Sequence, residues 1–162
     1  MTAAGRRNLL LEVVAALSRI GLGLLWIGEG VIKLRAGFGA SDILLVADGA
    51  EGSRAASVAV PIADLLMRPL AGLLGPLIPF LEVGLGVVLV LGVLVVPAAL
   101  SAAAVAGTYW AMDLLTVAYP AMVVLIALVL ATAVHQRAAS LPGLIAARRR
   151  DGAMEEAGTV GA

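Results

Sequence analysis

Residues 78–135 are apolar almost throughout and read IPFLEVGLGVVLVLGVLVVPAALSAAAVAGTYWAMDLLTVAYPAMVVLIALVLATAVH. A helix that crosses a bilayer needs about 20 such residues at a rise of about 1.5 Å each, so three helices fit in this stretch. Proline disrupts a helix interior and favours the first turn, and Pro97 and Pro120 mark two breaks. The stretch therefore predicts membrane spans at about 78–96, 98–118 and 120–136.

A further apolar stretch runs from Leu9 to Leu34. A signal peptide has a shorter apolar core, of about 7–15 residues, and a small-residue cleavage site. This stretch is longer and contains charged residues, so we interpret it as a retained span at about 13–33, after an N-terminal segment 1–12. The expected fold is all-α: an integral membrane four-helix bundle over residues 13–136.

The composition supports this class and excludes others. Of the 162 residues, 62% are hydrophobic and 14% charged, against roughly 45–50% and 25% in soluble domains. The net charge is zero, so no basic excess favours nucleic acid. The chain has no cysteine and one histidine, so we expect no thiol redox centre and no haem or metal ligated by this chain.

Residues 34–77 carry several charges and glycine-rich joints, and we expect them to form a long extracytoplasmic loop. Within this loop, the segment PIADLLMRPLAGLLGPLIP places leucines three and four residues apart, which indicates a short interfacial helix broken near Pro69. The tail, residues 137–162, is small, charged and rich in glycine and alanine, so we expect it to be mostly disordered beyond Arg150.

The flanking arginines predict the orientation. Short segments on the cytoplasmic side of a membrane carry an excess of Lys and Arg. The relevant residues lie before the first span and after the fourth: Arg6, Arg7, Arg137, Arg148, Arg149 and Arg150. We therefore expect a multi-pass protein of the cytoplasmic membrane with both termini cytoplasmic.

Charged side chains inside the spans are the first candidates for chemistry, because each costs at least about 2.5–3.5 kcal/mol at a helix centre. Glu29, Glu82 and Asp113 fall at similar depths in the outer half of the membrane, and Lys33 shares a face with Glu29. We expect these four residues to form one polar cluster, and they are the catalytic candidates. Two interpretations stay open: satisfied ion pairs near the interface, or a site that binds a ligand or handles protons.

The candidates for substrate binding are three aromatic residues and one arginine. Trp26, Tyr109 and Trp110 lie near the acids and are placed either to line a pocket for a planar ring or to form an interfacial belt. Arg19 lies nearer the cytoplasmic side. It either pairs with Glu12 or caps carbonyl groups of a neighbouring helix, or else it contacts an anion or lipid head group.

Two motifs resemble a known family. The stretch SRIGLGLLWIGEGVIKL, residues 18–34, resembles the opening helix of DoxX-family membrane proteins. The stretch PFLEVGLGVVLVLGV, residues 79–93, is similar to the family's second helix, in which an acidic residue precedes glycines. The four spans and the long first loop also agree with the family. The resemblance covers residues 18–135 and implies recurring polar positions at Arg19, Lys33 and Glu82.

The DoxX family includes the DoxD-type subunits of thiosulfate:quinone oxidoreductases. The resemblance thus implies a small subunit of a bacterial respiratory complex, lying in the lipid bilayer with other subunits as partners. One hypothesis is a non-redox-active subunit that contributes a quinone-binding or proton-handling site at the outer leaflet, with quinone as the cofactor. The alternatives are a non-enzymatic anchor or assembly subunit, and a small transporter or proton path.

Overall fold

The computed structural model describes residues 3–136 and residue 140, and the secondary structure of this part is entirely helical. The expected disorder of the tail falls on residues outside the described part, apart from Ser140. The elements in chain order are α1 (Ala3–Ala36), α2 (Ala40–Asp48), η1 (Ala50–Gly52), α3 (Ala56–Ile62), η2 (Ala63–Met67), α4 (Arg68–Leu91), α5 (Val95–Ala111), α6 (Tyr119–Ala131) and η3 (Ala133–His135).

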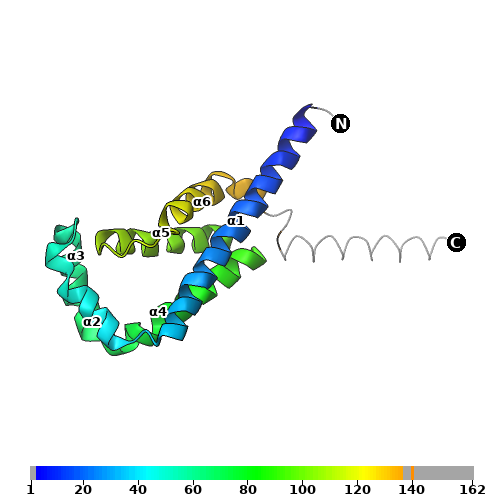
Figure 1. The fold of residues 1–162 in the computed structure, drawn as a ribbon. Helices are drawn as coiled ribbons and strands as arrows, with labels where there is room; N and C mark the ends of the chain where they lie inside the picture. Colours follow the sequence, from blue (N-terminus) through cyan, green and yellow to red (C-terminus); the bar gives the residue numbers. More distant parts are fainter. Residues whose placement is uncertain (1–2, 137–139, 141–162) are drawn as a thin grey trace.

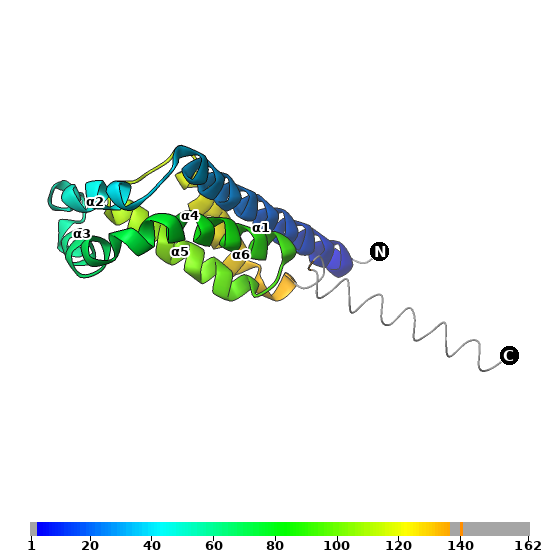
Figure 2. The ribbon, with the colours of Figure 1, turned by 90° about the horizontal axis from the view of Figure 1, so that it is seen from below.

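The helices form a bundle and an adjoining lobe. Helices α1, α4, α5 and α6 pack together as the bundle, with α1 lying mainly against α4 and α6. Helices α2 and α3 lie beyond one end of it, as both views show (Figures 1 and 2). We call residues 40–67, which comprise α2, η1, α3 and η2, the lobe. The N-terminal end of α1 lies at the opposite end of the molecule from the lobe (Figure 2).

Glycines bring α1 and α4 into close contact. A Cβ added at Gly23 would lie 2.7 Å from the Gly86 carbonyl oxygen, and one at Gly30 would lie 2.6 Å from the Pro79 carbonyl oxygen. Neither distance leaves room for a side chain, so the two backbones touch at both points. Such approaches are typical of membrane helix pairs with small residues at the interface. They fix the side chains that α1 and α4 present to each other.

The second long helix begins much earlier than residue 78. Elements α3, η2 and α4 form one helical run, Ala56–Leu91, of 36 residues. The prolines do not break this run. At Pro69 a π-helical turn, Ala63–Met67, precedes the proline, and such turns let a helix continue through a local distortion. Together with α2, the run makes most of the expected loop at 34–77 helical.

Two helices of the described part are long and apolar enough to cross a membrane by length and composition. They are Gly5–Ala36, with 32 residues, and Ala56–Leu91, with 36 residues. Helices α5 and α6 are apolar too but shorter, with 17 and 13 residues.

The turns around α5 also differ from expectation. The break expected at Pro97 lies earlier, where Gly92 and Leu94 have φ angles of +71° and +49°. Helix α5 ends at Ala111 rather than near 118, because Asp113 takes a left-handed conformation with φ of +58°. The Leu114 N–H then donates to the Tyr109 carbonyl oxygen at 2.8 Å, the hydrogen bond of a Schellman motif, which usually has glycine at the left-handed position. Pro120 lies in the first turn of α6, as its position predicts.

Each part of the molecule has its own apolar core. The bundle core contains Leu22, Trp26, Leu89, Val95, Ala98, Ala99, Ala102, Ala106, Met122, Ile126 and Val129. The lobe core contains Ile43, Ala47, Ala50, Ala59, Ala63, Met67, Ala71 and Met112. Met112 belongs to the segment between α5 and α6, so the lobe core holds the start of this segment in place.

Candidate functional site

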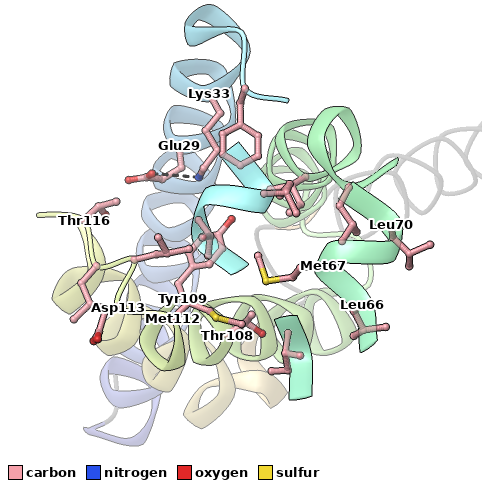
Figure 3. Close-up of a pocket in the computed structure, with 18 residues that line it drawn as sticks. Glu29, Lys33, Leu66, Met67, Leu70, Thr108, Tyr109, Met112, Asp113 and Thr116 are labelled. Carbon is pink, nitrogen blue, oxygen red and sulfur yellow. Dashed lines mark ion pairs between the residues drawn. The ribbon is translucent and has the colours of Figure 1, made fainter. Parts of the chain in front are cut away.

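A cavity of about 570 Å³ lies where the lobe meets the bundle (Figure 3). Its volume falls in the range of small-molecule pockets, about 300–1,000 Å³. Most of its wall is apolar and comes from the turn between α1 and α2, the lobe, α4 and the segment after α5: Phe38, Ile43, Val46, Ile62, Leu66, Met67, Leu70, Leu74, Ile78, Met112, Leu114 and Leu115. The polar lining residues are Glu29, Lys33, Thr108, Tyr109, Asp113 and Thr116.

A cluster of charged groups borders the cavity, and we call Glu29, Lys33, Glu82 and Tyr109 the lysine cluster. The Lys33 Nζ atom lies 2.7 Å from Glu82 Oε1 and 3.6 Å from Glu29 Oε2. The Tyr109 hydroxyl donates to the same Glu82 oxygen. Lys33 Nζ also lies 5.0 Å from the centroid of the Tyr109 ring, within cation–π range. Figure 3 shows the ion pair of Glu29 with Lys33 at the edge of the cavity.

The members of the cluster differ in exposure. The Glu82 side chain is 0% exposed, whereas those of Glu29 and Lys33 are 15% and 19% exposed. Glu82 does not line the cavity, whereas Glu29, Lys33 and Tyr109 do. A ligand in the cavity thus meets Glu29 and Lys33 first, and Glu82 lies behind them.

The helix geometry explains how the cluster forms. Glu29 and Lys33 are four residues apart on α1 and therefore lie on one face. The close contact of α1 with α4 lets Lys33 reach Glu82, and α5 adds Tyr109. An unpaired carboxyl group inside a protein is costly, and Lys33 and Tyr109 give Glu82 a cation and a hydroxyl donor as partners. The Glu82 Oε2 atom is buried and has no hydrogen-bond partner in the described part of the chain.

Asp113 lines the same cavity as Glu29 and Lys33, but its ion pair is with Arg54 and not with a member of the lysine cluster. Since α5 ends at Ala111, Asp113 lies beyond the helix and interacts with Arg54 at the edge of the lobe. The Arg54 backbone N–H donates to Asp113 Oδ2 at 2.9 Å, and the Arg54 guanidinium pairs with the other oxygen. These bonds hold the pKa of Asp113 below its usual range. Asp113 therefore ties the segment after α5 to the lobe.

Of the three aromatic candidates, only Tyr109 lines the cavity. Trp26 is 1% exposed in the bundle core, where its ring centroid lies 6.3 Å from that of Tyr109. Trp110 is 46% exposed, and the Arg54 guanidinium carbon lies 5.9 Å from its ring centroid. The second aromatic residue of the wall is Phe38, which sequence reasoning missed. Its N–H donates to the Lys33 carbonyl oxygen at 3.0 Å, just past the end of α1.

Arg19 caps the far end of α4, which is one of the alternatives that its position predicts. Its Nη1 atom donates to the Leu89 and Val90 carbonyl oxygens at 3.1 and 3.2 Å. A cation is favoured there, because carbonyl groups at a helix C-terminus carry partial negative charge. Glu29 lies about ten residues further along α1, or ~15 Å by helix rise. Arg19 is therefore remote from the cavity and serves the packing of α4.

Sequence reasoning also missed the aliphatic wall. Met67, Leu70 and Leu74 lie in a stretch that was expected to be a loop because of its charges and glycine-rich joints. The spacing of its leucines was a usable signal, since it indicated a helix. That helix faces the cavity on one side.

Comparison with family models, curated proteins and solved structures gives no match to this chain. The resemblance to the DoxX family stays a prediction, and the cavity with its polar edge carries the functional argument.

Proposed function

We propose that this chain is a small multi-pass subunit of a bacterial membrane redox complex and binds a quinone-like ring in the cavity beside Lys33. The observation that carries the proposal is the cavity itself, apolar along most of its wall and bordered by Glu29, Lys33 and Tyr109. A quinone needs an apolar groove for its ring and tail, a hydrogen-bond donor for a carbonyl oxygen and a nearby group that exchanges protons. Lys33 offers the donor and Glu29 the carboxylate.

The proposed membrane arrangement has four spans, formed around α1, α4, α5 and α6, with the lobe outside the membrane. It is supported by the two long apolar helices and by the apolar character of α5 and α6. The resemblance to DoxX proteins at Arg19, Lys33 and Glu82 supports the link to respiratory complexes. Because the chain has no cysteine and one histidine, the proposal assigns the electron donor to a partner subunit.

The topology is testable with reporter fusions. We expect a reporter fused after Arg150 to behave as cytoplasmic and one inserted near Gly52 as external, because the terminal arginines hold both ends inside. An external reporter after Arg150 would overturn the proposed orientation.

Quinone binding is testable with one pair of neighbouring substitutions on α4. Leu74 lines the cavity, whereas Leu73 does not and is 59% exposed. We expect Leu74→Trp to fill the cavity and weaken binding of a short-tailed benzoquinone at least about tenfold, the loss of roughly 1.4 kcal/mol of binding free energy. Leu73→Trp should bind as the parent does. Equilibrium dialysis of the purified protein measures both, and parent protein that binds no quinone would refute the proposal.

A second candidate is a non-enzymatic anchor that holds a partner protein through the lobe. It is favoured by the large apolar side chains on the lobe surface, since Leu45 and Leu65 are 73% and 74% exposed. Such patches mark protein or membrane contacts. If Leu65→Asp releases a copurifying partner while the parent binds no benzoquinone, the anchor function is the better account.

A further inference from the structure

We infer that Glu29, Lys33 and Glu82 together hold one exchangeable proton, which is shared by the two carboxyl groups and exchanges with the cavity at Glu29. This inference deepens the proposed function, because it assigns a stored proton to the polar edge of the cavity. Only the identity of the proton acceptor rests on the proposed function, since the cluster can hold the proton without a ligand.

The charge balance of the cluster is the first step. Both ion pairs use the same Lys33 ammonium group, so two carboxyl groups share one cation. No other cation in the described part of the chain forms an ion pair with Glu29 or Glu82. With both acids ionised, the cluster would carry one excess negative charge in a poorly solvated place. Groups in that position bind a proton and become neutral.

The environment of Glu82 is the second, independent observation. Its Oε1 atom accepts from both Lys33 and Tyr109, whereas its Oε2 atom is buried without a partner in the described part of the chain. Oε1 thus accepts two hydrogen bonds, and Oε2 accepts none from the described residues. A proton carried by Oε2 would leave both bonds at Oε1 in place.

The neighbouring elements offer no further compensation. Helix α1 presents Glu29 and Lys33, α4 presents Glu82, and α5 presents Tyr109, a hydroxyl that donates and carries no positive charge. The segment after α5 brings Asp113 to the cavity, but Asp113 is already paired with Arg54. Since Glu29 and Glu82 interact through one lysine, the proton belongs to the pair and not to either residue.

The exposures set the direction of exchange. Glu29 lines the cavity and its side chain is 15% exposed, whereas Glu82 is 0% exposed and does not line it. Release therefore breaks a carboxyl O–H bond and forms an O–H or N–H bond on an acceptor at Glu29, either water or a group in the cavity. No electron changes hands in this step.

Infrared spectroscopy of the full chain in lipid bilayers tests the inference, because the C=O stretch of a protonated carboxyl group is distinct from that of a carboxylate. At neutral pH we expect the signal of one protonated carboxyl group in the parent. Glu29→Gln and Glu82→Gln should each abolish it completely, since either change leaves one acid balanced by Lys33. Lys33→Met should double it, because both acids then lack a cation.

Asp113→Asn is the matched control, since it removes an exposed carboxylate paired elsewhere, and it should leave the signal unchanged. Circular dichroism checks that the variants fold. If Lys33→Met does not fold, the two glutamine variants alone test the inference. A parent without the signal, or a signal that survives both glutamine changes, overturns the inference. A parent that lacks the signal and is stabilised by sodium ions would show that a metal cation fills the place of the proton. Failure to bind benzoquinone would refute the proposed function alone, because the infrared signal needs no ligand.

Discussion

Helix α1 carries two largely enclosed cations, Arg19 and Lys33, and they are stabilised in different ways. Arg19 donates to carbonyl oxygens at the C-terminal end of α4, groups that do not titrate. Lys33 lies between two carboxyl groups that do, and it borders a cavity. The comparison teaches that a charge within an apolar helix is a functional candidate only when its partners can change their protonation state and reach a ligand.

The largest expected effect is that of Lys33→Met. The substitution leaves Glu82 buried without its cation, and such a loss costs about 3–5 kcal/mol of unfolding free energy. The measurement is the thermal or denaturant unfolding of the purified protein. Arg35→Met is the control, because Arg35 lies on the same helix but is exposed, and its change should fall within about 0.5 kcal/mol of the parent.

Adding Glu82→Gln to Lys33→Met sharpens this result. In the double variant a neutral amide replaces the buried carboxyl group that Lys33→Met leaves without its partner, so it should regain part of the lost stability. If the double variant is less stable than Lys33→Met alone, the ion pair is not what makes Lys33 important.

Gly92→Ala probes the contact of Arg19 with the C-terminal end of α4 and has a smaller expected effect. Gly92 has φ of +71°, and an added Cβ would lie 2.7 Å from the Arg19 guanidinium carbon. Gly37 has the same φ of +71°, but an added Cβ would meet nothing within 4 Å. We expect Gly37→Ala to cost about 1 kcal/mol from backbone strain and Gly92→Ala about 1–3 kcal/mol more. Equal losses in the unfolding free energies of the two variants would mean that the Arg19 side chain moves aside without a cost in stability.

The smallest expected effect concerns Asp113, whose ion pair is exposed. Its pKa is lowered in the folded protein by Arg54, so its contribution to stability is present above the unfolded pKa, about 3.9. That contribution is lost as the pH falls through the lower folded value. The fluorescence of Trp110, which lies beside Arg54, should report this change in the acid range. In Asp113→Asn this acid transition should disappear, and its persistence would assign it to another group.

The sequence predicted best what depends on local periodicity. The four-residue spacing of Glu29 and Lys33 and the depth of Glu82 were enough to expect these three side chains together, and the structure brings them together. The pairing of Asp113 with Arg54 was not predicted, because the end of α5 depends on a left-handed residue and on Met112 packing into the lobe core. Neither event has a clear sequence signal, since aspartate only tolerates this conformation and does not demand it.

The region 34–77 was harder to predict for a related reason. Its charges and glycine-rich joints resemble those of a loop, yet the run from Ala56 to Leu91 is continuous and passes Pro69 after a π-helical turn. The position of such a turn depends on how the lobe packs. Trp26 was hard to place for the same reason. The sequence indicated its depth in the membrane, but packing against neighbouring helices decides that its side chain lies in the bundle core and not in the cavity wall.

The continuity of that long helix has a mechanical consequence. Met67 in the lobe, Leu74 in the cavity wall and Glu82 at the lysine cluster all lie on one continuous helical run, which changes direction between α3 and α4 (Figure 1). The lobe is therefore joined to the helix that carries the buried acid without an intervening loop. A molecule that displaces the lobe, whether it enters the cavity or docks from outside, would act on the same chain segment that holds Glu82 beside Lys33.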